Sequence, residues 1–254
     1  MAWPAATLAG KGSASAGPFP FRPVRFRVRD ERARADRIRV MRIDPAGWPF
    51  ILGALLPAGV LAWLGYTAGA VPLAVVGAFF VFFFRDPDRT SAGAAADVVA
   101  PADGRVMLAG AAVAEAAPPG SWQQVSIFLS PMDVHVNRVP ISGRVTKVEY
   151  RPGRFLPAYR REAAAENERN ELWIDHDGQT LVCRQVVGIL ARRIVCRVGP
   201  GAEVQAGQRF GVMKFGSRID LFLPAASSLR VGVGDRVRAG VTVVATLTPP
   251  RLAG

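Results

Sequence analysis

The pattern of hydrophobic and polar positions along this chain changes near residue 85. Residues 45–84 contain no charged side chain and are almost entirely apolar. A helix that crosses a bilayer needs about 20 apolar residues, so this run has room for two segments. We therefore predict a helical hairpin with segments at 48–64 and 71–84, joined by a turn at 65–70.

The predicted hairpin is expected to lie in a membrane. The segment 71–84 is short for a full crossing, so both a transmembrane and a re-entrant hairpin are considered. Trp48 and Trp63 lie near segment ends, where interfacial aromatic residues gather. The helix should end near Arg85-Asp86-Pro87, because the residue before a proline disfavours helix. A hairpin buried in a soluble protein is the alternative.

From residue 98 onward, short apolar runs alternate with glycine, proline and polar turns, which predicts β-strands. One helix is expected around 159–168. Residues 198–207 and 231–240 share a glycine-rich turn followed by Val-x-Ala-Gly, which resembles the hairpin unit of biotinyl/lipoyl-type domains. The predicted fold class is mainly β (α+β), a helical hairpin followed by a β-sandwich with such units. Its clearest strands are expected at 125–129, 143–150, 172–175, 180–187 and 193–198.

Composition favours a membrane partner over nucleic acid. The 254 residues carry a formal net charge of +12, which suggests an anionic partner. Half of the residues are hydrophobic and the mean hydropathy is +0.20, which is high for so basic a soluble protein. No aromatic-basic pattern typical of nucleic-acid binding follows the basic tract. That tract lies just before the hairpin and holds Arg22, Arg25, Arg27, Arg29, Arg32, Arg34, Arg37, Arg39 and Arg42.

The order of these segments predicts domains and topology. Residues 1–44 are expected to be a disordered basic segment, 45–84 the hairpin and 85–254 a β domain. No cleaved secretory signal is predicted, because the apolar segment starts too late and is too long. Arginines on both sides of the hairpin place both ends in the cytoplasm by the positive-inside rule. We expect a protein of the cell (inner) membrane with its β domain on the cytoplasmic side.

The bond between Gly216 and Ser217 is the first candidate for chemistry, since it lies between two apolar strands. Glycine takes backbone angles closed to other residues, so its carbonyl can be approached by the neighbouring hydroxyl. Attack would convert the peptide to an ester, and elimination would leave a pyruvoyl group as a built-in carbonyl cofactor. An ordinary β-turn is the simpler interpretation of an isolated Gly-Ser pair.

The chain has two histidines. If residues 133–137 form a strand, Asp133, His135 and Asn137 share one face, and His135 becomes a candidate proton carrier near neutral pH. A buried histidine with satisfied hydrogen bonds is the alternative. His176 lies in an Asp-His-Asp-Gly turn and is expected in a surface loop.

Asp103 lies in a tight glycine turn that leads into a strand. It is interpreted either as an Asx-turn or as a carboxylate that orients and charges His135, as the acid does in a Ser-His-Asp system. Cys183 and Cys196 lie in apolar runs and are expected to be small buried residues. Two cysteines form neither a disulfide framework nor a zinc site, and no metal is predicted.

Five short motifs, together and in this order, resemble the phosphatidylserine decarboxylase proenzymes of the short form, which carry their own membrane hairpin. The resemblance extends from about residue 48 to the C-terminus. The motifs are Phe83-Phe84-Arg85-Asp86-Pro87-Asp88-Arg89, Pro101-Ala-Asp103-Gly104, Leu129-Ser-Pro-Met-Asp-Val-His135-Val-Asn-Arg-Val-Pro140, Asn167-Glu-Arg-Asn170 and Lys214-Phe-Gly216-Ser217-Arg-Ile-Asp220.

The resemblance implies a pyruvoyl-dependent enzyme that decarboxylates phosphatidylserine to phosphatidylethanolamine and CO2 at the membrane surface. Autocatalytic cleavage would give a large chain ending at Gly216 and a small chain, 217–254, which remain together as a heterodimer. Ser217 would become the pyruvoyl cofactor, which forms a Schiff base with the substrate amine. His135 and Asp103 would assist cleavage and later proton transfer.

Basic residues near a membrane surface attract anionic lipid, so Arg85, Arg89 and Arg138, together with Asn137, are candidate substrate contacts, with structural or solvated roles as the alternative. Arg138 stands where long-form relatives have a second histidine, and an arginine follows the serine in place of a small hydroxyl residue. The competing interpretation is a membrane-tethered biotinyl/lipoyl-type carrier domain modified at Lys214. A nucleic-acid partner is not expected, and a higher oligomer stays open.

Overall fold

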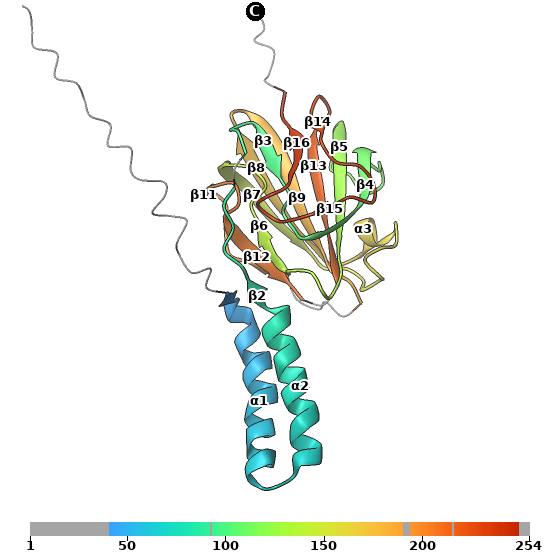
Figure 1. Cartoon of the computed structure of the whole chain (residues 1–254). Coiled ribbons are helices and arrows are strands. Elements are labelled where there is room, and N and C mark those ends of the chain that lie inside the picture. Colours follow the sequence, from blue (N-terminus) through green and yellow to red (C-terminus); the bar gives the residue numbers. More distant parts are fainter. Residues whose placement is uncertain (1–40, 92, 190–193, 215, 249–254) are drawn as a thin grey trace, which may run out of the picture. The chain divides into compact units, whose positions relative to one another are not determined.

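The computed structural model describes residues 41–91, 93–189, 194–214 and 216–248. The predicted hairpin is confirmed, with α1 (Trp48–Trp63) and α2 (Thr67–Phe83) side by side in Figure 1. A short 3-10 turn, η2 (Pro45–Gly47), leads into α1. The second helix begins before residue 71, because the amide of Ala70 already donates to the carbonyl of Tyr66 at 3.0 Å.

The hairpin carries apolar side chains on its outside. Trp63 is 85% exposed, and Leu56 and Val75 are exposed as well. By length and composition, the helical stretch Pro45–Trp63 could cross a membrane, whereas Thr67–Phe83 is shorter. Contiguous exposed apolar surface of this kind marks a site of interaction with a membrane or another protein.

The residues just before the hairpin form a strand, so the predicted disorder of 1–44 is wrong at its C-terminal end. β1 (Arg42–Ile43) pairs antiparallel with β2 (Arg85–Asp86), which follows α2. The amide of Asp44 donates to the carbonyl of Phe84 at 2.8 Å. Residues 1–40, with the remaining arginines of the basic tract, lie outside the described residues.

The main element after the hairpin is a curled antiparallel sheet of eight strands in the order β11-β7-β8-β9-β13-β5-β4-β15 (Figure 1). The strands near its centre are long and mostly buried, whereas β11 and β15 are short strands at its two edges. Its members are β4 (Gly104–Ala111), β5 (Trp122–Leu129), β7 (Gly143–Arg151), β8 (Arg169–His176), β9 (Gln179–Val186), β11 (Glu203–Val204), β13 (Ser217–Pro224) and β15 (Arg236–Val237).

Two three-stranded sheets complete the β part. Val98 and Phe210 from these small sheets and Ile127 and Leu221 from the large sheet belong to one buried cluster. The core therefore lies between the large sheet and the small ones, and each fully buried aliphatic or phenyl side chain contributes about 1.5–3 kcal/mol. The small sheets are β10 (Ile194–Cys196), β12 (Arg209–Met213) and β6 (Val136–Arg138), and β14 (Ser228–Leu229), β16 (Val243–Thr246) and β3 (Asp97–Val99).

The five predicted strands correspond to β5, β7, β8, β9 and β10, with residue 193 outside the described residues. The helix predicted around 159–168 is shorter, since α3 spans only Ala163–Glu166. Asn167 ends it in an extended conformation. Its side chain accepts from the amide of Leu156 at 2.9 Å and donates to the carbonyl of Val187 at 2.9 Å, so it holds two loops instead of a helical turn.

The internal repeat appears as two matching turns. Gly201 and Gly234 occupy equivalent positions with φ of +86° and +96°, a region that favours glycine. The strands within the two units, β11 and β15, lie at opposite edges of the large sheet. A mainly β fold after an apolar hairpin is thus confirmed. The β-sandwich class, the likeness to biotinyl/lipoyl units and the boundary between residues 84 and 85 stay predictions.

Candidate active site

The Gly-Ser bond lies at a corner between strands, as predicted. β12 ends at Met213 and β13 begins at Ser217. Gly216 has φ of +71°, in the left-handed region that residues with a Cβ seldom adopt. Its carbonyl lies against Gly188, where a Cβ atom would collide with the carbonyl oxygen. The corner therefore depends on glycine on both sides of this contact.

The hydroxyl of Ser217 is buried and has no hydrogen-bond partner among the described residues. Ser217 pairs with Leu129 of β5 and is 0% exposed. Leaving a buried polar group unsatisfied costs about 1–3 kcal/mol, so such an exception calls for an explanation. Reactivity of the hydroxyl toward its own peptide bond would be one.

His135 has one ring nitrogen fixed and the other without a partner in the described part of the chain. Nδ1 lies 2.9 Å from the carbonyl oxygen of Asp133. Because a carbonyl can only accept, Nδ1 carries the proton, and in the neutral ring Nε2 presents a lone pair. Nε2 is buried and has no hydrogen-bond partner among the described residues. The backbone has therefore selected the tautomer in which Nε2 is a base.

The environment of His135 keeps its imidazole neutral. Burial lowers its pKa from 6.5 to about 4, and the positive charge of Arg85 acts in the same direction. The hydrogen bond to the Asp133 carbonyl and the negative charge of Asp103 act against this, with smaller effects. At neutral pH the ring is thus unprotonated at Nε2.

Strand pairing brings His135 and Ser217 to the same corner. β6 pairs with β12 through Val136 and Val212, and the amide of Met213 lies 3.4 Å from the carbonyl of His135. From the other side, Leu129, the partner of Ser217, leads through a short loop to His135. Both residues therefore lie beside the connection 214–216.

The prediction that Asp133, His135 and Asn137 share one face of a strand is wrong, because β6 begins only at Val136. Asp133 belongs to a turn in which its carboxylate accepts from the amide of Ser130 at 2.8 Å. This turn places the Asp133 carbonyl within hydrogen-bond distance of Nδ1 of His135. The side chain that was expected to share the active face is replaced by a backbone group.

Asn137 is fully buried and is held by a chain of amides. Its Oδ1 accepts from Nε2 of Gln185 at 2.8 Å, and Oε1 of Gln185 accepts from Nδ2 of Asn170 at 3.1 Å. Nδ2 of Asn137 has no partner within the described ranges. Gln185 pairs with Ile219, two residues from Ser217 on the same strand face. Asn137 therefore points its unused donor into the interior near this corner.

Asp103 does not hold the imidazole through a hydrogen bond in the part of the chain that is described. Its carboxylate forms an ion pair with Arg89, whose Nη2 lies 2.7 Å from Oδ2, and accepts from the amide of Ala239 at 2.7 Å. Its negative charge nevertheless raises the pKa of His135. The orienting role predicted for Asp103 falls to the Asp133 carbonyl, and the interaction of Asp103 with the ring is electrostatic.

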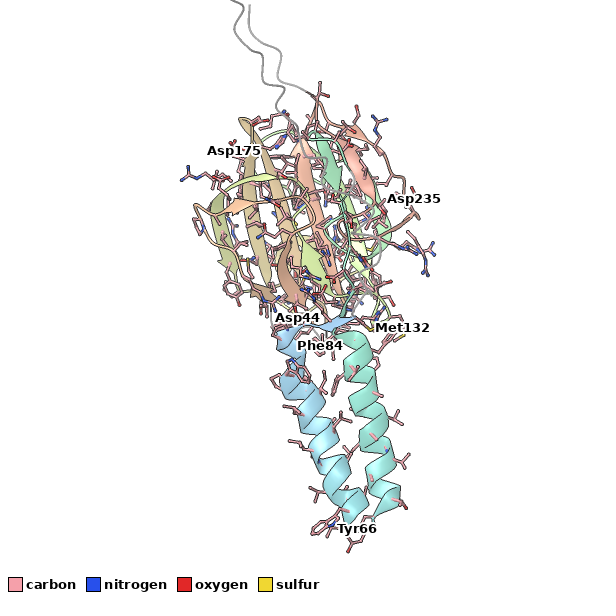
Figure 2. The ribbon with its side chains drawn as sticks, turned by 60° about the vertical axis from the view of Figure 1, so that its left-hand side comes forward. Asp44, Tyr66, Phe84, Met132, Asp175 and Asp235 are labelled. Carbon is pink, nitrogen blue, oxygen red and sulfur yellow. The ribbon has the colours of Figure 1, made fainter. Side chains whose placement is uncertain are left out.

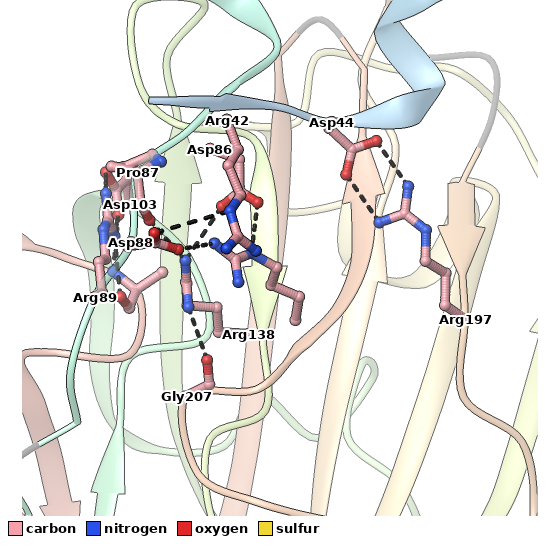
Figure 3. A network of polar contacts seen from close by, with 12 residues as sticks. Arg42, Asp44, Asp86, Pro87, Asp88, Arg89, Asp103, Arg138, Arg197 and Gly207 are labelled. Atoms are coloured by element: carbon pink, nitrogen blue, oxygen red, sulfur yellow. Dashed lines mark hydrogen bonds and ion pairs between the residues drawn. The ribbon is translucent and has the colours of Figure 1, made fainter. Parts of the chain in front are cut away.

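Two of the three candidate arginines, Arg89 and Arg138, lie in a network of polar contacts (Figure 3). Arg138 is buried and donates to Asp86 at 3.2 Å and to the carbonyl of Gly207 at 2.9 Å. Arg89 is committed to Asp103. A substrate contact for Arg138 conflicts with this enclosure, since its charge is already paired inside the protein.

Arg85 is the arginine that remains open to an anion. It donates to the carbonyls of Phe82 at 2.8 Å and Met132 at 2.6 Å, and its guanidinium lies over the Phe82 ring. Among the residues that the structure describes, it forms no ion pair with a carboxylate. Arg85 is half-buried at the end of α2, where the apolar hairpin meets the strands.

Comparison with known proteins decides the family. Residues 76–245 match the family model described as phosphatidylserine decarboxylase. The chain belongs to the phosphatidylserine decarboxylase family. The matched region contains every residue of the corner described above, from Arg85 through His135 to Ser217.

Relatives of known name cover most of the chain. The phosphatidylserine decarboxylase proenzyme of Nitrosomonas europaea is 43% identical over 200 residues, which are 78% of this chain and 92% of that protein. The proenzyme of Saccharopolyspora erythraea is 43% identical over 221 residues, 83% of this chain and 91% of its own length. That of Prosthecochloris aestuarii is 46% identical over 172 residues, 66% of this chain and 77% of the relative.

Membership in the decarboxylase family gives no support to the carrier-domain alternative. Lys214 directly follows β12 and its ammonium lies 4.6 Å from the centre of the Phe50 ring on α1. A carrier lysine should sit in an exposed turn of a hairpin, and Lys214 is only half-exposed. No cluster of three metal-ligating side chains occurs among the described residues.

The remaining sequence predictions have mixed outcomes. His176 is the last residue of β8 and is half-buried, with Nδ1 2.8 Å from the carbonyl of Ser142, so the predicted surface loop is wrong. Its ring contacts the loop at Ser142 and makes no hydrogen bond with Ser217 or His135 among the described residues. Cys183 is buried, as predicted, and burial raises the pKa of its thiol, whereas Cys196 is only half-buried.

Sequence reasoning missed two residues of the site. Gly188 has no side chain and so leaves space for the Gly216 carbonyl. Gln185 links Asn137 to Asn170 through hydrogen bonds. Gly188 directly follows an apolar strand, which signals only a turn. A glutamine inside the apolar run 180–187 was the available signal for a buried polar contact.

Proposed function

We propose that this chain is a self-processing proenzyme that cleaves itself between Gly216 and Ser217 and then decarboxylates phosphatidylserine at a membrane. The observation that carries the proposal is the buried Ser217 hydroxyl, which has no hydrogen-bond partner among the described residues, beside a left-handed glycine in the region matched by the decarboxylase family. The relatives are named proenzymes, which accords with a maturation step.

The self-cleavage step starts with transfer of the Ser217 hydroxyl proton to Nε2 of His135. Oγ bonds to the carbonyl carbon of Gly216 while the peptide C–N bond breaks, and the proton passes to the freed nitrogen to give an ester. Elimination removes the Cα proton of Ser217 and breaks its Cβ–Oγ bond, leaving a Gly216 carboxylate and dehydroalanine. Its imine tautomer takes up one water and releases ammonia, so residue 217 becomes a pyruvoyl group.

The geometry of the corner suits this step. A neutral His135 with a lone pair on Nε2 is the form that can accept the proton. Gly216 gives the Ser217 hydroxyl access to its carbonyl, and Gly188 leaves room for that carbonyl to become tetrahedral. Asp103, through its negative charge, favours the imidazolium formed during the transfer.

After cleavage, the protein would hold the pyruvoyl group at the start of β13. When present, its carbonyl would supply the electron sink for loss of CO2 from the amino-acid headgroup of the substrate. The chain's own residues would do the rest: β13 keeps the group in place through its pairing with β5 and β9. His135 would carry the proton, and Asn137 would offer its unused amide donor.

The two chains should remain associated as a heterodimer after the cut. The small chain would comprise residues 217–254 and contributes β13, which lies between β9 and β5 of the large chain. Its inward residues Ile219, Leu221 and Leu223 belong to the common core. Separation of the chains would expose these side chains and break two strand ladders.

The substrate would reach the site along the hairpin. Apolar side chains cover the outside of α1 and α2. Arg85 lies at the end of the hairpin that meets the β domain, close enough to His135 for its charge to act on the ring. A cation near a membrane surface attracts anionic lipid by about 1 kcal/mol. We assign the lipid phosphate to Arg85, and not to Arg89 or Arg138. The arginines on both flanks favour a cytoplasmic β domain at the inner membrane.

The test is decarboxylation by purified protein in mixed micelles of detergent and phosphatidylserine, with release of CO2 and formation of phosphatidylethanolamine measured. Wild type should form both products in equal amounts. Ser217→Ala should be an uncut and inactive chain. Product formation by an uncut chain would overturn the proposed mechanism, and a cut chain that fails to act on this lipid would overturn the substrate assignment.

A further inference from the structure

The C-terminal end of the hairpin forms a direct contact with the proposed base. The rings of Phe83, the last residue of α2, and His135 have centroids 4.0 Å apart and planes inclined by 31°. Phe83 is 0% and His135 1% exposed. One face of the imidazole is therefore covered by an aromatic ring from the hairpin.

The contacts of the next residue, Phe84, hold this end of α2 in place. The carbonyl of Phe84 accepts from the amide of Asp44, and the Phe84 ring fills the space where a Cβ at Gly47 would lie. Asp44 in turn accepts two hydrogen bonds from Arg197, at 2.7 and 2.8 Å. Figure 2 shows Asp44, Phe84 and Met132 at the same end of the hairpin, with Tyr66 at the other.

A second contact follows Phe83 in the sequence. Arg85 donates to the carbonyl of Met132 at 2.6 Å, and Met132 lies in the turn that ends at Asp133. The same turn supplies the carbonyl that binds Nδ1 of His135. The end of the hairpin thus touches both the imidazole and the loop that orients it.

One hydrogen bond does not fully fix an imidazole, because the ring can still leave that geometry by rotation about the Cα–Cβ and Cβ–Cγ bonds. A flat ring packed against its face removes this freedom and excludes water. The charged groups that act on His135 are Arg85 at the end of the hairpin and Asp103 before β4, and the Asp133 turn acts through its backbone hydrogen bond. None of these covers the ring face that Phe83 occupies.

We propose that Phe83 is a positioning residue for His135, so that the end of the membrane hairpin is one wall of the catalytic corner as well as an anchor. This inference rests on the proposed role of His135 as the base. It predicts that loss of the Phe83 ring impairs the chemistry without removing the hairpin from the membrane.

The experiment compares Phe83→Leu with Phe79→Leu in a His176→Asn background. Phe79 lies one turn earlier on the same helix, 5.9 Å from Phe83, so its substitution removes the same ring from the same hairpin. His176→Asn leaves a single imidazole, whose titration is followed by NMR in detergent. This signal reports on His135 whether or not the protein is active.

In the Phe79→Leu control, His135 should titrate near pH 4, as expected for the buried ring. In Phe83→Leu, water reaches the ring, and the titration should move toward 6.5 by at least about one pH unit. Misplacement of a reacting group by about 1 Å costs roughly 100-fold in rate, so self-cleavage should slow by about 10- to 100-fold. Phe83→Tyr keeps the ring and should restore both properties.

If Phe83→Leu titrates and cleaves like Phe79→Leu, the positioning role is refuted. If His135→Ala cleaves normally while the Phe83→Leu titration shifts, the packing is right and the proposed role of the base is wrong. Should Phe83→Leu fail to fold, Phe83→Tyr and Phe83→Met still decide the question. The first keeps a flat ring and the second keeps only the volume, so equal behaviour of the two would refute the role.

Discussion

Acidification should destabilise the uncut chain through His135. The folded protein holds this imidazole neutral until about pH 4, whereas the unfolded chain binds its proton near pH 6.5. Between these values the unfolded state binds more protons, so stability falls as the pH falls. The contribution is fully present above pH 6.5 and is lost progressively toward pH 4.

The size of the effect follows from the pKa difference. Lowering the pKa from 6.5 to about 4, at 1.36 kcal/mol per unit, corresponds to about 3 kcal/mol. This is a large share of the 5–15 kcal/mol typical of a folded domain. Burial of His135, with 1% exposure, makes solvent screening a small correction.

The assay uses the Ser217→Ala chain, which stays uncut, and measures its free energy of unfolding in detergent from pH 7 to pH 4. The same measurement is made after adding His135→Asn, which removes the titration. The difference between the parent and the His135→Asn chain should change by about 3 kcal/mol across this range.

Taking the difference between the two chains cancels the contribution of the carboxylates to the pH dependence of stability, because they titrate in both chains. A stability difference between parent and His135→Asn that does not depend on pH would refute the reasoning. It would mean that the imidazole is hydrated or paired in the folded protein, and that burial does not set its protonation.

Three further changes test the site. Gly188→Ala should slow self-cleavage by at least about 10-fold, because the new Cβ would collide with the Gly216 carbonyl. The rate is measured by gel separation of the two chains, and cleavage at the wild-type rate would contradict the close contact. Arg85→Gln should raise the KM for micellar phosphatidylserine several-fold, and an unchanged KM would argue against lipid binding. Asp103→Asn should slow both cleavage and turnover, as His135→Ala should, whereas a maturation rate equal to that of His176→Ala would remove Asp103 from the mechanism.

The hairpin and the strand corner could be predicted because each follows from local patterns. An uncharged run such as 45–84 leaves few alternatives to apolar helices, and Gly216-Ser217 between two apolar runs marks a corner wherever the strands lie. Both depend on neighbours in the sequence. The length of α3 was mispredicted because Asn167 bonds to distant loops, which no local pattern records.

The interactions within the site could not be predicted because backbone groups and pairing partners carry them. The Asp133 carbonyl, not a carboxylate, orients His135, and any residue type could supply that carbonyl. Arg138 looks like a free cation in the sequence, yet Asp86 and Gly207 enclose it. Phe83 looks like one more apolar residue of the hairpin, and only the fold brings its ring to His135.

The most direct test of the account is the intact mass of the purified wild-type protein under denaturing conditions. We predict two species, a large chain that ends with a Gly216 carboxylate and a small chain that begins with a pyruvoyl group at residue 217. Their summed mass should equal that of the precursor plus one water minus one ammonia. A single uncut chain in protein that decarboxylates phosphatidylserine, or a small chain that begins with an intact serine, would contradict the central claim.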